Sequence, residues 1–148
     1  MDLHPDLTDL LRAFSSSNVE YLIVGGWAVS VHSEPRFTKD LDLLVGNAPE
    51  NLARAAAALR LFGAPETIVA QASALASDEF LFFGSPPARV DLLTSIPGVE
   101  FADAWTRRVD VDFGGVLVHV ISRPDLICAK RAAGREKDLR DLRALEKE

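Results

Sequence analysis

One stretch near the N-terminus, residues 19–45, constrains the fold of this chain more than any other. Residues 19–24 are almost continuously apolar and rich in β-forming side chains, a pattern that predicts a strand covered on both faces. Gly25 and Gly26 end this run, and residues 28–32 form a short apolar segment that predicts a helix. We therefore expect a first structural unit in which a strand gives way to a helix at two glycines.

A second strand is predicted directly after this unit. Pro35 disfavours helical backbone at the residue before it, so residues 33–38 are expected to form a loop. Residues 41–45 are apolar and predict the strand, and Asp40 and Asp42 lie at its start. Because side chains alternate along a strand, the two aspartates point to one face and the apolar residues between and after them point to the other.

The two aspartates and the two glycines have complementary chemistry. Two carboxylates on one face raise each other's pKa, and a divalent cation such as Mg2+, which prefers hard oxygen ligands, removes that cost. Glycine lets the backbone approach a ligand closely, and the N-terminus of the next helix offers free N–H groups that favour phosphate. One end of the unit is therefore expected to bind a polyphosphate and the other its metal.

The composition narrows the class of protein. A length of 148 residues, without a repeat or a linker, fits one domain over residues 1–148. The net charge is -6, from 16 Lys and Arg against 22 Asp and Glu, which argues against tight non-specific nucleic-acid binding. The lone cysteine, Cys128, cannot form an internal disulfide, and acids interrupt the N-terminal segment. We therefore expect a cytoplasmic protein without a signal peptide or membrane span.

Helices and strands alternate along the rest of the chain. A helix is predicted from Pro5 until residues 15–18, and further helices at residues 49–61, 101–108, 125–133 and 135–147. Strands are predicted at residues 79–83, 89–94, 109–113 and 116–121, with the last two joined as a hairpin by a Gly-Gly turn. Residues 67–71 fit either a strand or the start of a helix. Cys128 is expected in the core.

A third acid, Asp91, lies inside the predicted strand of residues 89–94, on the face opposite Val90 and Leu92. If this strand lies beside the one that carries Asp40 and Asp42, three carboxylates converge. Such a cluster suits two Mg2+ ions that activate an attacking hydroxyl and stabilise a leaving pyrophosphate. The alternative is that each aspartate is an ordinary solvent-facing strand residue, although aspartate is depleted in strands.

A second pair of acids, Asp110 and Asp112, repeats the spacing of the first pair. No strand–Gly-Gly–helix unit precedes it, two arginines lie beside it, and a turn follows it. We interpret this pair as the solvated face of an exposed hairpin.

These residues together resemble a known family. Gly25-Gly26, the Asp40-Leu-Asp42 strand and Asp91 on a strand of its own are similar to the motif of the nucleotidyltransferase superfamily of the DNA polymerase β type. Residues 25–28, 36–42 and 130–141 resemble its small bacterial branch more closely. That branch includes antibiotic nucleotidyltransferases and the nucleotidyltransferase-like toxins of toxin–antitoxin pairs. The resemblance implies an α/β (α+β) fold, with a mixed β-sheet flanked by helices and two C-terminal helices.

The resemblance also implies roles for individual residues. Asp40 and Asp42 bind both metals and the triphosphate of an NTP, and Asp91 completes one metal site and helps to deprotonate an acceptor hydroxyl. The residues that bind or flank the nucleotide are Gly25, Gly26, Lys130, Arg36 and Thr38. For Lys130 a solvated surface position is an equal alternative, and Arg36 and Thr38 are more simply explained as loop residues. Lys137 and Asp138 are either part of a substrate rim or solvated.

Two functions from different classes follow from this resemblance. The first is an enzyme that moves a nucleoside monophosphate from an NTP to a hydroxyl acceptor on a small molecule, an RNA end or a protein, with Mg2+ as cofactor. The second is a catalytically silent module that binds nucleotide or a partner protein, such as an antitoxin. The intact set of three acids favours the first, and the lack of the further helical domain that many members carry favours the second.

Overall fold

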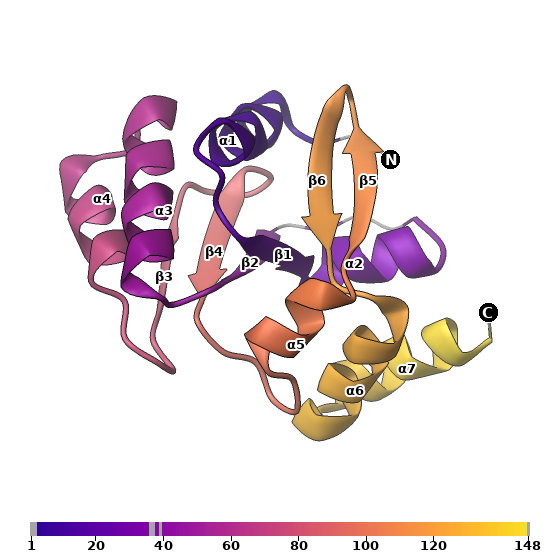
Figure 1. The fold of residues 1–148 in the computed structure, drawn as a ribbon. Helices are drawn as coiled ribbons and strands as arrows, with labels where there is room; N and C mark the ends of the chain where they lie inside the picture. The colour runs from indigo at the N-terminus through magenta and orange to yellow at the C-terminus, as the bar shows by residue number, and fades with distance from the viewer. Residues whose placement is uncertain (1–2, 36–37, 39, 148) are drawn as a thin grey trace.

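The computed structural model describes residues 3–35, 38 and 40–147, which form a six-stranded sheet with helices around it (Figure 1). The strands are β1 (Tyr21–Val24), β2 (Asp40–Val45), β3 (Phe80–Phe83), β4 (Arg89–Leu93), β5 (Val109–Phe113) and β6 (Val116–Val120). The helices are α1 (Pro5–Ser16), α2 (Gly25–His32), α3 (Pro49–Phe62), α4 (Glu66–Ser73), α5 (Phe101–Thr106), α6 (Arg123–Ala133) and α7 (Glu136–Glu146).

The sheet is mixed, as expected, with strand order β3-β4-β2-β1-β6-β5. β1 runs antiparallel to β2 and parallel to β6, β2 runs parallel to β4, and the β3–β4 and β5–β6 pairs are antiparallel. All four residues of β1 are buried, which confirms the prediction of a strand covered on both faces. β1 and β2 thus occupy the centre of the sheet.

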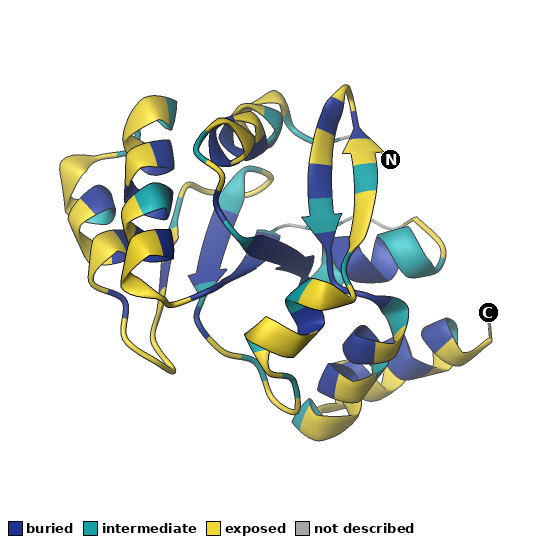
Figure 2. Cartoon of the chain, in the orientation of Figure 1, coloured by how far each residue is buried: buried dark blue, intermediate teal, exposed yellow. Residues whose placement is uncertain are grey.

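Alternation along β2 and β4 divides the sheet into two faces. Leu41, Leu43, Val90 and Leu92 are fully or almost fully buried and project to the face covered by α1, α3 and α4, where Phe62 of α3 contacts the ring of Phe83 on β3. The exposed residues of α3 and α4 lie on the side away from the sheet (Figure 2). On the other side, α2 packs against α6 and α7. The face that carries the aspartates is therefore the one turned away from α3 and α4.

Most predicted elements are present with small shifts at their ends. The largest difference is α2, which begins at Gly25 and not at residue 28. Both glycines therefore lie in the first turn of the helix instead of preceding it. Residues 67–71, which fit two interpretations, lie in α4. Gly134 adopts a left-handed conformation (φ 64°) that ends α6, so the C-terminal helices are separate.

The expectation about Cys128 was wrong. Cys128, expected in the core, is exposed, and its thiol donates a hydrogen bond to the Gly98 carbonyl at 3.3 Å. This residue lies on the outer side of α6, whereas the neighbouring Ala129 is buried.

No helix in the described part of the chain combines the length and the apolar character that crossing a membrane requires.

Candidate active site

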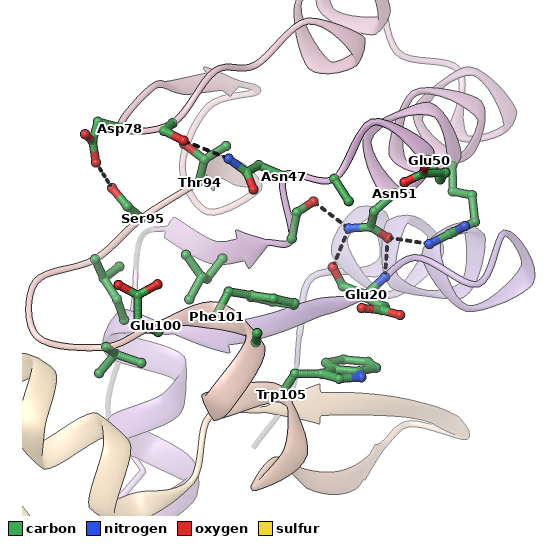
Figure 3. Close-up of a pocket in the computed structure, with 18 of the residues that line it drawn as sticks. Glu20, Asn47, Glu50, Asn51, Asp78, Thr94, Ser95, Glu100, Phe101 and Trp105 are labelled. Atoms are coloured by element: carbon green, nitrogen blue, oxygen red, sulfur yellow. Dashed lines mark hydrogen bonds between the residues drawn. The ribbon is translucent and has the colours of Figure 1, made fainter.

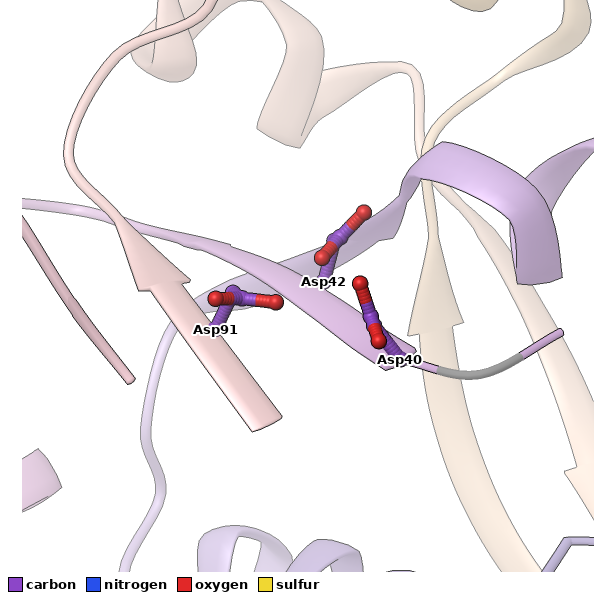
Figure 4. Close-up of side chains that lie close together, drawn as sticks. All are labelled: Asp40, Asp42 and Asp91. Atoms are coloured by element: carbon purple, nitrogen blue, oxygen red, sulfur yellow. The ribbon is translucent and has the colours of Figure 1, made fainter. Parts of the chain in front are cut away.

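The predicted convergence of three carboxylates is present in the structure. β2 and β4 are neighbours, and their register places Asp42 directly beside Asp91. One carboxylate oxygen from each of Asp40, Asp42 and Asp91 lies within 4.8 Å of the other two. Figure 4 shows the three side chains turned toward one another from the two strands. The cluster, which we call the acid triad, forms because a parallel pairing joins segments about fifty residues apart in the chain.

The electrostatics of the acid triad favour a bound cation. Burial raises the pKa of the Asp42 carboxyl to about 7, and the charges of Asp91 and Asp40 act in the same direction. Asp91 is 8% exposed and accepts a hydrogen bond from the Arg89 guanidinium at 3.0 Å. Since hard oxygen ligands suit Mg2+ and a divalent ion would relieve this repulsion, the residues present fit such a metal.

Gly25 is required by the geometry of the acid triad itself. Its φ is +67°, and a Cβ built on it would lie 2.2 Å from Oδ2 of Asp42. A side chain at this position would therefore both strain the backbone and displace the carboxylate. Gly25 is also the first residue of α2, whose N-terminus has no side-chain cap. Backbone N–H groups that could bind phosphate thus begin directly beside the acid triad.

The other predicted nucleotide-binding residues occupy different environments. Gly26 is the second residue of α2 and is half-buried. The hydroxyl of Thr38 is shielded from solvent and has no hydrogen-bond partner among the described residues. Arg36 lies outside the described residues, so its prediction cannot be compared with the fold.

Lys130 is buried between the two C-terminal helices. Its ammonium group contacts Asp141 at 2.9 Å and Asp138 at 3.3 Å on α7, and Asp138 is fully buried and also bound by Arg135. The alternative of a solvated surface lysine was therefore wrong, and so was a solvated position for Asp138. Whether Lys130 also contacts phosphate stays a prediction, because its charge here is balanced by two carboxylates.

Three basic residues lie near the acid triad, and the sequence patterns did not identify two of them, Arg89 and Arg135, as site residues. Arg89 contacts Asp91 directly, and its place two residues earlier on the same strand was a signal that could have identified it. Lys137 in the first turn of α7 and Arg135, the N-cap of that helix, lie close enough to Asp42 for their charges to act on it. Only Lys137 had been considered, as part of a substrate rim.

The second acid pair has the structural role that we predicted for it. Asp110 accepts a hydrogen bond from the His119 ring at 2.6 Å and pairs with Arg108 at 3.5 Å, and Asp112 accepts one from the Gly115 backbone at 2.7 Å. Both acids are exposed on β5. These contacts stabilise the hairpin and its turn, and they explain the spacing without any catalytic role.

A cavity of about 1120 Å³ lies at the opposite end of β2 (Figure 3). Glu20, Asn47, Phe101 and Trp105 are among its lining residues. The Asn51 side chain donates to the carbonyls of Glu20 and Gly46 and accepts from the Glu20 amide, so it fastens the start of β1 to the end of β2. Of the predicted site residues that the structure describes, none lines this cavity.

The sequence as a whole matches a family model. Residues 5–146 match the model described as "Nucleotidyltransferase of unknown function (DUF6036)". The chain belongs to this family. The matched residues include the acid triad, Gly25-Gly26 and both C-terminal helices.

A solved structure shares the fold of this chain. It is the lincomycin-bound crystal structure of the lincosamide antibiotic adenylyltransferase LnuA, with a TM-score of 0.55 and 15% sequence identity. The alignment covers 99% of this chain and 98% of that one. At such low identity the similarity establishes the nucleotidyltransferase fold and not a shared substrate. No curated protein matches the chain.

Proposed function

We propose that this family member is an active, Mg2+-dependent enzyme that moves a nucleoside monophosphate from an NTP to a hydroxyl acceptor. The observation that carries this proposal is the acid triad, with its three carboxylate oxygens within 4.8 Å of one another, beside Gly25. Holding three carboxylates together, with Asp91 buried and Asp40 and Asp42 half-buried, is unfavourable without a cation. If the acid triad had only a structural role, no bound cation would offset the repulsion between its carboxylates.

In this proposal Asp91 accepts the proton of the acceptor hydroxyl. The acceptor oxygen forms a bond to the α-phosphorus of the NTP, the bond from that phosphorus to the bridging oxygen breaks, and pyrophosphate leaves. Asp40 and Asp42 would hold Mg2+, which neutralises the triphosphate and stabilises the charge on the leaving group. The hydrogen bond from Arg89 holds one oxygen of Asp91 in place.

The triphosphate is proposed to lie at the start of α2. Gly25 and Gly26 provide backbone N–H groups there, and the helix dipole favours an anion. Lys137 is exposed and lies near Asp42, so it is better placed than the paired Lys130 to neutralise phosphate. Thr38 and Arg36 are proposed to flank this site.

The acceptor is proposed to be a hydroxyl on a small molecule, an RNA end or a protein. LnuA is described as a lincosamide adenylyltransferase with lincomycin bound, which favours a small molecule within this fold. We also propose that the protein is cytoplasmic and that it can bind a partner protein such as an antitoxin. The alternative, a silent module that binds nucleotide or a partner, keeps the fold but requires no turnover.

Calorimetric titration of the purified protein with each of the four NTPs, with and without Mg2+, tests the proposal. We expect Mg2+-dependent binding of at least one NTP, weakened by Asp40→Asn and unchanged by the matched Asp112→Asn. Pyrophosphate release in the same samples separates enzyme from silent module. Absence of binding to every NTP would refute the nucleotide site, and binding without pyrophosphate release, even after a panel of hydroxyl acceptors is added, would favour the silent module.

A further inference from the structure

A row of paired residues crosses the sheet through the acid triad. Phe82 of β3 pairs with Asp91 of β4, Asp91 pairs with Asp42 of β2, and Asp42 pairs with Val24 of β1, which precedes Gly25. Residues directly opposite each other on neighbouring strands project to the same face. One face of the sheet therefore presents, in order, an aromatic ring, the third acid, the acid pair and the glycine turn.

This order separates the two substrates of the proposed reaction. If the triphosphate lies at Gly25, the pyrophosphate leaves toward β1 and α2. In phosphoryl transfer the attacking and leaving oxygens are roughly in line on opposite sides of the phosphorus. The acceptor must then approach from the side of β4 and β3, where Asp91 can take its proton and Phe82 comes next in the row.

The side chains on that side form an open apolar surface. Phe80 is 62% exposed and Phe82 is 51% exposed, whereas Leu81 between them is buried. The Arg89 guanidinium lies 4.1 Å from the centre of the Phe82 ring while it also donates to Asp91. We call Phe80, Phe82 and Arg89 the shelf. Since one contact of Arg89 is to Asp91, the shelf is joined directly to the acid triad.

The charge around the shelf selects against a polyanion. In residues 78–94 the charged side chains are Asp78, Glu79, Arg89 and Asp91, and the single arginine is paired with an acid. Binding to nucleic acid requires several unpaired basic groups that replace counterions. An exposed phenylalanine, by contrast, offers a flat apolar face to another ring.

We propose that the shelf binds the acceptor, and that the acceptor is a small, uncharged or cationic molecule with a hydroxyl on or next to a ring. The ring lies against Phe82 with its hydroxyl at Asp91. This inference rests on the proposed function. Of the three acceptor classes proposed there (a small molecule, an RNA end and a protein), it selects the small molecule.

Ligand-observed NMR with phenyl β-D-glucopyranoside tests the shelf. This probe carries ring hydroxyls and a flat apolar ring, and the protein is held with Mg2+ and a non-hydrolysable ATP analogue. We expect binding at about 10 mM probe, the range for one stacked ring, and about fivefold weaker binding by Phe82→Ala. Phe82→Tyr, which keeps the ring, should bind as wild type does. Leu117→Ala removes an equally exposed apolar side chain, 55% exposed, from β6 and should change nothing.

Three outcomes would overturn the shelf: equal binding by wild type and Phe82→Ala, no binding of the probe to wild type, or binding of an RNA dodecamer that Phe82→Ala weakens instead. Binding of the ATP analogue and of the corresponding GTP, CTP and UTP analogues is measured under the same conditions. Loss of the Phe82 effect with normal binding of an analogue refutes the shelf alone, whereas absence of binding of all four analogues refutes the proposed function.

Discussion

Replacing Asp42 by asparagine should stabilise the metal-free protein while it abolishes turnover. The pKa of Asp42 rises from 3.8 to about 7, with burial as the main cause. A carboxyl whose pKa is higher in the folded state binds its proton more tightly there than in the unfolded chain. Ionisation of Asp42 therefore lowers the free energy of unfolding, progressively between these two pKa values, and the loss is complete at higher pH.

The magnitude follows from the size of this shift. Each pKa unit corresponds to about 1.4 kcal/mol, so the whole shift corresponds to about 4 kcal/mol. Because the shift is shared with Asp91 and the carboxyl keeps some contact with solvent, we expect Asp42→Asn to raise the free energy of unfolding by about 2 to 4 kcal/mol at about pH 8. At about pH 5 the folded protein already carries the proton, and the gain should fall to about 1 kcal/mol.

Urea denaturation in EDTA, at about pH 5 and about pH 8, measures both values. The matched control is Asp112→Asn, which makes the same chemical change on the exposed β5–β6 hairpin and should alter the free energy of unfolding by less than about 0.5 kcal/mol. A variant at position 42 that is no more stable than wild type at the higher pH would refute the reasoning, since it would mean that the buried carboxylate carries no electrostatic cost.

Further predictions concern three other positions. Gly25→Ala should abolish NTP binding and lower the free energy of unfolding more than Gly63→Ala does, because both have positive φ but only Gly25 has a carboxylate within 4 Å of the added Cβ; calorimetry and urea titration compare them, and equal effects would contradict the steric argument. Asp138→Asn should cost about 3 kcal/mol, since it breaks a buried ion pair, whereas Glu146→Gln in an exposed pair should cost less than about 1 kcal/mol; urea titration distinguishes them, and similar losses would mean that burial of the pair is unimportant. Cys128 should react with a thiol reagent in the folded protein at nearly the rate of the unfolded chain, and strong protection would count against its exposed position.

Local patterns in the sequence were sufficient for most elements and for the acid pair. The spacing of Asp40 and Asp42 fixes their common face whatever the partner strand is, and the same alternation predicts that Asp91 opposes Val90. Asp40 contributes to the raised pKa of Asp42, as their spacing predicts, although burial and Asp91 contribute more. These properties depend on neighbours within a few residues, which is why they could be predicted without a model of the whole fold.

Properties that depend on long-range pairing could not be derived in this way. The parallel pairing of β2 with β4 brings Asp91 beside Asp42, and only the family resemblance had suggested it. The contact of Lys130 with two acids of α7 requires the angle between two helices, and the exposure of Phe82 requires that β3 be an edge strand. In each case the property depends on how separate helices or strands pack, which local sequence patterns do not determine.

The contact between Gly25 and Asp42 explains why these residues have to be considered together. A glycine at the start of a helix is commonly interpreted as space for phosphate, yet here a Cβ on Gly25 would meet the Asp42 carboxylate before any ligand arrives. The same backbone position thus admits the metal ligand and leaves helix N–H groups free for an anion. A chain that held only a structural sheet would need neither the left-handed glycine nor the buried carboxylate beside it. Their coincidence at one point is the strongest physical argument for the proposal that the site binds a cation and a polyphosphate together.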